Sequence, residues 1–201
     1  MIRNICLTLI ETPDIEAKAR EHFAAVGFED VSFYYGIHAK TAGLKTENVY
    51  PIDHPEENFN MGPHGVGIYV SFRSLWSAML LLPEDHFMLV EHDVVFHDNW
   101  KARFEQAMKD VPPGFDFLLL GHCCAADKPA TQISGEVWEV KYPMCNHAAV
   151  ISRKCLKTLI QKCNRCWAPI DLQLIFEAFP HLKVYTLMPR LADQFNTVLS
   201  P

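Results

Sequence analysis

Two acids, Glu91 and Asp93, follow directly after a short apolar run. The residues before them, at positions 87–90, are Phe, Met, Leu and Val, and two valines come after them. Two carboxylates separated by one residue can both turn toward a hard cation where a strand ends, and such a cation offsets the charge of a departing diphosphate. The pattern predicts a divalent metal site at Glu91 and Asp93. The alternative interpretation is a strand-end turn with exposed acids.

A strand must position these two acids, and the apolar run at 87–90 predicts a short buried strand directly before them. Further strands are predicted at residues 2–9, 31–35, 115–120, 137–142, 145–151 and 184–188. Helices are predicted at residues 15–26, 65–82, 100–109, 152–163 and 170–179, with Thr12, Asp98 and Ser152 as caps and a long polar loop over 41–63. This alternation predicts one α/β domain over residues 1–201, with a mostly parallel sheet flanked by helices. Ligands of such sheets gather beyond the carboxyl ends of the strands, where the acids lie.

The composition is that of a folded, soluble chain. Of the 201 residues 49% are hydrophobic and 21% are charged, which suffices for a substantial core. No apolar run approaches the roughly 20 residues of a membrane span, and the N-terminal segment reads as a strand rather than a signal peptide. We therefore expect an intracellular, cytoplasmic protein, or one of the host cytoplasm if the source is a virus.

Seven cysteines in a chain of this size predict reduced thiols, because a core this large does not need disulfides. Cys163 and Cys166 have the spacing of a zinc-binding pair, and Cys123 and Cys124 could complete four ligands. No second pair with metal-binding spacing exists, so ordinary buried or surface thiols are the alternative.

A basic stretch lies between Glu139 and Asp171, where no acidic residue occurs although the net charge of the chain is −6. Such a stretch is commonly a solvated helix face, and it can also bind a diphosphate, a phosphorylated glycan or nucleic acid. Its cations are Lys141, Arg153, Lys154, Lys157, Lys162 and Arg165.

The segment from Phe87 to Val94 resembles the strand and Glu-Asp-Asp-Val signature of glycosyltransferase family 25, the lipooligosaccharide and collagen galactosyltransferase group. Six other segments resemble the family in the same order: residues 5–9, residues 33–39, residues 67–71 with Leu75 and Trp76, residues 147–153, residues 168–171, and Pro189 with Gln194. The resemblance spans residues 2–197. It departs from the family at His92, which replaces the middle acid, at Phe72, which replaces a histidine, and in lacking the usual arginine near the first helix.

The resemblance implies a GT-A-like (Rossmann-like) domain that transfers a hexose from a UDP-sugar to a saccharide hydroxyl, with inversion and with Mn²⁺ or Mg²⁺. It makes Asp171 the candidate base, although this position also suits a helix N-cap, whose carboxylate is less basic. Glu91, Asp93 and His147 would hold the metal, since imidazole commonly joins carboxylates around manganese-like ions, while a lone histidine on an apolar strand is also commonly a core residue. The implied donor-binding residues are Leu7, Thr8, Ser71, Glu91, His92, Arg153 and Gln194.

Two other functions stay open at this point. The basic stretch suits a DNA glycosyltransferase acting on a hydroxymethylated base, because phosphate contacts would dominate affinity for that acceptor. A non-catalytic sugar-nucleotide-binding module is the other, since a fold by itself does not establish an activity. The retained acids Glu91 and Asp93 argue against the second.

Overall fold

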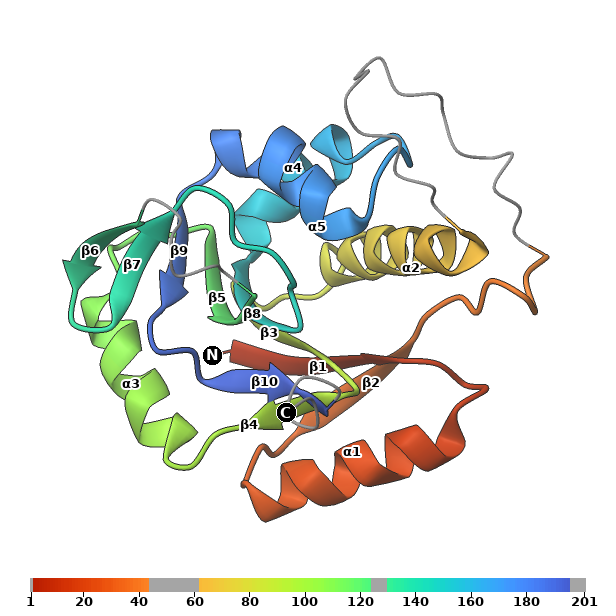
Figure 1. Ribbon diagram of the computed structural model, residues 1–201, viewed down its shortest axis with the longest axis horizontal. Coiled ribbons are helices and arrows are strands. Elements are labelled where there is room, and N and C mark those ends of the chain that lie inside the picture. The colour runs from red at the N-terminus through yellow and green to blue at the C-terminus, as the bar shows by residue number, and fades with distance from the viewer. Residues whose placement is uncertain (1, 44–61, 124–129, 196–201) are drawn as a thin grey trace.

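The computed structural model describes residues 2–43, 62–123 and 130–195 (Figure 1). Its main sheet has eight strands in the order β2-β1-β3-β8-β5-β9-β7-β6, and β4 and β10 form a separate antiparallel pair. The strands are β1 (Ile2–Thr8), β2 (Val31–Tyr35), β3 (His86–Glu91), β4 (Val94–Phe96), β5 (Phe117–Gly121), β6 (Ala130–Ser134), β7 (Val137–Val140), β8 (Ala148–Ser152), β9 (Val184–Leu187) and β10 (Ala192–Gln194). The helices are α1 (Pro13–Ala25), α2 (Pro63–Met79), α3 (Trp100–Asp110), α4 (Leu156–Lys162) and α5 (Ile170–Gln173).

The sheet is mixed, and most of its strands share one direction. β1 pairs in parallel with β2 and β3, and β5 pairs in parallel with β9. β8 runs against its neighbours β3 and β5, and β7 runs against β9 and β6. The prediction of an α/β domain with a mixed, mostly parallel sheet flanked by helices is confirmed.

Strand β3 lies inside the sheet and is covered on both faces. Its residues 87–90 are at most 3% exposed. Because side chains alternate along a strand, Phe87 and Leu89 pack in the core beneath α2, α4 and α5, whereas Met88 and Val90 pack in the core beneath α1 and α3. A continuous apolar run is the pattern of a strand buried in this way. Figure 1 shows α2, α4 and α5 on one side of the sheet and α1 on the other.

One edge of the sheet collects residues from distant parts of the chain. The parallel register pairs Leu7 with Glu91, so β1 and β3 end together. β8 runs the other way and therefore begins at the same edge, where the N–H of Glu91 donates to the carbonyl of His147 at 2.9 Å. The turn after β2 joins them, because the N–H of Gly36 donates to the Thr8 carbonyl at 2.7 Å.

Several local predictions need correction. Thr12 stands at the N-cap of α1, but its hydroxyl donates to the Leu9 carbonyl, and α3 has Asn99 rather than Asp98 at its N-cap. The helix expected over 152–163 starts as a 3₁₀ turn, Arg153–Cys155, and Ser152 bonds Asp116 instead of capping it. The helix expected over 170–179 is α5 followed by a π-helical turn, η3 (Leu174–Ala178), and a 3₁₀ turn, η4 (Phe179–His181). Most of the loop predicted at 41–63 lies outside the described residues.

The expectation of reduced thiols is wrong for Cys123 and Cys145, which form a disulfide. Burial raises the pKa of the free thiols of Cys163 and Cys166 to about 12 and about 11, so both stay protonated. Cys124 lies outside the described residues, and within them no three His, Cys, Asp or Glu side chains form a metal-binding group. The zinc alternative therefore finds no support there. None of the described helices has the length and hydropathy to cross a membrane.

The burial of β3 leads to a stability prediction. Leu89 is 2% exposed, and we expect Leu89→Ala to lower the free energy of unfolding by about 2–5 kcal/mol because it removes apolar contacts and leaves a cavity. Leu81 is 86% exposed, so the same substitution there is the matched control and should change stability by less than about 0.5 kcal/mol. Urea unfolding of the two variants measures both values. Equal effects would contradict the central position of β3.

Candidate functional site

A small cavity of about 180 Å³ opens beyond the ends of β1 and β3, against α2. Five of the predicted donor-binding residues line it, and so does Asp93. The lining residues are Leu7, Thr8, Leu9, Gly36, Ile37, His38, Ala39, His64, Ile68, Ser71, Phe72, Glu91, His92 and Asp93. The structure therefore brings the predicted donor-binding and metal-binding residues of β1, α2 and β3 to one place.

Ser71 shapes one wall of this cavity. Its hydroxyl donates to the Gly67 carbonyl and accepts from the N–H of Ile37, both at 2.7 Å. A Cβ at position 36 would lie 2.7 Å from the Ser71 oxygen, so the turn after β2 can approach α2 this closely only with glycine. Ser71 thus holds the turn in place, and only one acceptor lone pair of its hydroxyl remains for a ligand.

Glu91 lies among other negative charges. Burial, together with the nearby carboxylates of Asp93 and Asp171, raises the pKa of Glu91 to about 8 although its side chain is still partly exposed to the cavity. Among the described residues no Lys, Arg or His forms an ion pair with any of these three acids. Their mutual repulsion is relieved either by protonation of Glu91 or by a bound cation.

Several polar atoms at this edge are buried without a hydrogen-bond partner in the described part of the chain. They are Oγ1 of Thr8, Oδ1 of Asp93, both amide atoms of Asn146, and Nδ1 of His147. Buried polar groups are nearly always hydrogen-bonded in folded proteins, so atoms gathered in this way indicate a place for water, an ion or a ligand. Asn146 was not predicted as a site residue from the sequence, although it directly precedes His147.

The imidazole of His147 is held in one orientation. Its Nε2 lies 3.1 Å from the Ala192 carbonyl and must carry the hydrogen there, because a carbonyl can only accept. Burial lowers the pKa of His147, which favours the neutral ring with a free lone pair on Nδ1. Gly121 makes room for the ring, since a Cβ at that position would collide with it. A neutral imidazole fixed by its other nitrogen is the usual form of a metal ligand.

Asp171 lies in the first turn of α5 and belongs to the same group of charges, as its effect on the Glu91 pKa indicates. One carboxylate oxygen accepts from the N–H of Leu172 at 2.9 Å and the other from the N–H of Cys145 at 3.4 Å. The disulfide ties Cys145 to Cys123 at the end of β5. The carboxylate of the candidate base is therefore fixed by two backbone groups and keeps further lone pairs for a substrate.

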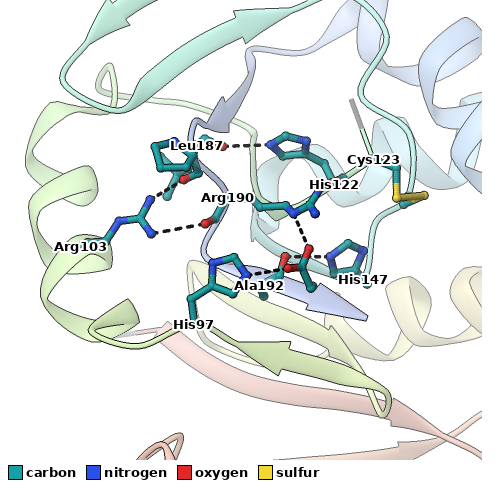
Figure 2. Close-up of polar contacts among 11 residues, drawn as sticks. His97, Arg103, His122, Cys123, His147, Leu187, Arg190 and Ala192 are labelled. Carbon is teal, nitrogen blue, oxygen red and sulfur yellow. Dashed lines mark hydrogen bonds and ion pairs between the residues drawn. A yellow bond between two sulfur atoms is a disulfide. The ribbon is translucent and has the colours of Figure 1, made fainter. Parts of the chain in front are cut away.

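Ion pairs hold the last described segment against the site (Figure 2). Asp193 pairs with Arg190 and with His97, whose Nε2 lies 2.7 Å away, and Arg190 also donates to the His122 carbonyl at 3.2 Å. Burial alone would raise the pKa of Asp193, but the hydrogen bond from His97 and the charge of Arg190 lower it overall. The segment so held includes the Ala192 carbonyl and Gln194, whose amide lies 3.4 Å from Asp93.

Arg153 is not brought to this site. It follows the end of β8, where Ser152 pairs with His86 at the start of β3, and its guanidinium donates to the Leu80 carbonyl at 3.0 Å. A larger hollow of about 740 Å³ lies at that opposite edge, lined also by Lys154. Because Lys154 is paired with Asp116 there and the clustered acids lie at the other edge, we do not take this hollow as the candidate site.

No protein-family model and no curated protein matches the chain. Among solved structures, a glycosyltransferase involved in the glycosylation of the major capsid of PBCV-1 has a TM-score of 0.51 at 12% identity, over 92% of this chain and 80% of that one. Mouse xyloside xylosyltransferase 1 has a TM-score of 0.44 at 11% identity, over 92% of this chain and 84% of that one. UDP-glucose pyrophosphorylase complexed with UDP-glucose has a TM-score of 0.47 at 8% identity, over 93% of this chain and 90% of that one. The first likeness confirms the GT-A-like fold, and identity this low shows the fold alone.

The pKa of Glu91 gives a pH-dependent prediction for protein kept in chelator. Below about pH 4.5 the side chain is protonated in both the folded and unfolded states, whereas between pH 4.5 and about 8 only the unfolded state releases the proton. Stability should therefore fall as pH rises through this window, by at most about 1.4 kcal/mol per unit. Glu91→Gln stays neutral, so its advantage over the unchanged protein should grow from pH 4.5 to pH 8.5 in thermal unfolding.

Glu105→Gln is the matched control, because Glu105 is exposed on α3. The pH dependence of the Glu91→Gln effect is measured relative to this variant. A Glu91→Gln effect that is constant with pH would contradict the burial of Glu91 beside the carboxylates of Asp93 and Asp171.

Proposed function

We propose that this chain is a metal-dependent glycosyltransferase that moves a hexose from a UDP-sugar to a saccharide hydroxyl with inversion, as the resemblance to family 25 implies. The observation that carries the proposal is the meeting of Glu91, Asp93 and Asp171 at the carboxyl edge of the sheet, next to buried polar atoms without partners. Open α/β sheets such as that of a GT-A-like fold bind their ligands beyond this edge. The clustered carboxylates and the fold therefore indicate the same position for the site.

The residues at this edge fit Mn²⁺ or Mg²⁺. Glu91 and Asp93 would hold the ion through carboxylate oxygens, and Nδ1 of His147 offers an imidazole lone pair close by. Within the described residues no three such side chains already converge as ligands, so water and donor phosphates would fill the other positions. When bound, the cation would offset the charge of the departing diphosphate.

The chain's own groups would position the donor. The cavity of about 180 Å³ is smaller than most complete ligand sites, so it suits only one part of a UDP-sugar. The diphosphate would then cross the strand ends, where the Thr8 hydroxyl and the Asn146 amide have unused hydrogen-bonding capacity. Both side chains are buried, and hydrogen-bond donors that are positioned in advance stabilise developing charge best.

Asp171 would act as the base. The acceptor oxygen attacks the anomeric carbon as the bond between that carbon and the diphosphate oxygen breaks, and the hydroxyl proton passes to the Asp171 carboxylate. The hydrogen bonds from Leu172 and Cys145 orient the carboxylate for this transfer. Inversion requires that the base and the leaving group lie on opposite sides of the sugar.

We expect a UDP-sugar to raise the melting temperature only when Mn²⁺ is present, by mass action on the folded state. A panel of UDP-, GDP-, CMP- and ADP-sugars, each with and without Mn²⁺, measures this by thermal shift. Asp93→Asn should abolish the metal-dependent shift and lower turnover at least about 100-fold, since the mutation removes a charged ligand while preserving size. Asp98→Asn, at an exposed turn position, is the matched control and should behave like the unchanged protein.

An active Asp93→Asn variant would contradict the assignment of Asp93 to the metal site. If no sugar nucleotide raised the melting temperature, the proposed class of donor would be wrong. Product analysis separates the two kinds of transferase seen among the structural neighbours. A glycosyltransferase releases UDP from a UDP-sugar, whereas a nucleotidyltransferase releases pyrophosphate from a nucleoside triphosphate.

A further inference from the structure

A second hollow, of about 540 Å³, lies between β6, β7, β9 and the helical turns after α5. Two exposed aromatic side chains line it, Tyr142 at 44% and Phe176 at 46% exposure. Their ring centroids are 6.3 Å apart, and the ring centroid of Trp167 lies 6.3 Å from that of Phe176. We call Tyr142, Trp167 and Phe176 the aromatic platform.

The backbone presents Phe176 outward through an irregular turn. Phe176 belongs to the π-helical turn η3, in which Leu174 and Ile175 are 1% and 5% exposed and pack into the core. π-Helical turns are rare and frequently occur at functional sites, because the extra residue redirects the side chains that follow. The exposed ring of Phe176 on this turn suits a ligand better than it suits the core.

Both sides of the platform are connected to the candidate base. Asp171 lies in the first turn of α5, five residues before Phe176, which is a rise of roughly 8 Å at the spacing of an α-helix. Tyr142 lies three residues before Cys145, whose N–H donates to Asp171. The segment 142–145 therefore contacts Phe176 at one end, through Tyr142, and the candidate base at the other, through Cys145.

We propose that this hollow binds the part of a saccharide acceptor that is remote from the reacting hydroxyl, with the apolar face of a sugar ring against Phe176 and Tyr142. The inference rests on the proposed glycosyltransferase function and names its acceptor site. The volume is within the usual range of 300–1,000 Å³ for ligand pockets, and apolar walls with a few polar groups are typical of them.

The charges of the lining favour a neutral saccharide over nucleic acid. The hollow has one acid, Glu139, and one base, Lys141, with the hydroxyl of Thr131 nearby. These groups can hydrogen-bond sugar hydroxyls, whereas a nucleic-acid groove needs cations along the phosphate backbone. Two other cations of the basic stretch, Arg153 and Lys154, are at the opposite edge from Glu91 and hold the protein's own groups.

The test uses an array of neutral di- to tetrasaccharides, followed by titration of the glycan that binds best. We expect Phe176→Ala to weaken binding of that glycan at least about ten-fold, and Phe176→Trp to restore it, because a ring face is what the sugar contacts. Leu81→Ala removes an exposed apolar side chain that does not line the hollow and should leave glycan affinity unchanged. Melting temperatures of all variants verify that they fold.

Glycan binding that is unchanged in Phe176→Ala would overturn the inference, and so would the absence of glycan binding by the unchanged protein. Retention of a single-stranded 20-mer DNA that is lost in Phe176→Ala would assign the platform to nucleic acid instead. The thermal shift with UDP-sugar and Mn²⁺ is measured on the same variants. A donor shift that persists without glycan binding refutes only the acceptor site, whereas a missing donor shift refutes the proposed function.

Discussion

Strand β3 hydrogen-bonds to β1 on one side and to β8 on the other, and helices cover both of its faces, so its four central residues must all be apolar. Glu91 is therefore the first residue after this buried run that can meet solvent. The same pairing determines which other residues lie beside it: the parallel register aligns the end of β1, and the antiparallel register aligns the start of β8. The candidate site is in this sense a consequence of how β3 is buried.

The edge of the sheet at Glu91 also holds charged and polar groups that interact unfavourably. Three carboxylates approach one another without a paired cation in the described residues, and the amide of Asn146 is buried without a partner. Both features cost stability in the ligand-free chain. In a purely structural region, replacing such groups by apolar residues would raise stability. Their presence is typical of sites that bind a ligand, because the ligand supplies the missing interactions.

The parts of the site that the sequence predicted depend on local signals. An apolar run ending in acids indicated β3 and Glu91, and Leu7, Thr8 and Ser71 line the cavity beside them. Arg153 was misplaced because the sequence does not reveal strand direction: β8 is antiparallel, so its start and not its end reaches the site. The disulfide, the His97–Asp193 ion pair and the position of Asn146 depend on contacts between distant segments. The π-helical turn depends on one extra residue within a helical pattern. None of these produces a periodic signal.

The proposed donor and acceptor sites are thus formed by different kinds of structural element. The donor side comes from β1, β3, α2 and the turn after β2, and the regular patterns of these two strands and this helix belong to the fold itself. The acceptor side comes from the β6–β7 hairpin, the segment after it and the turn η3, which interrupt that regularity. A glycosyltransferase can keep its donor chemistry while its acceptor changes only if the two sites can vary separately, and irregular segments tolerate substitution better than a strand buried on both faces. The residues that choose the acceptor are therefore expected in the region where likeness of fold is least informative.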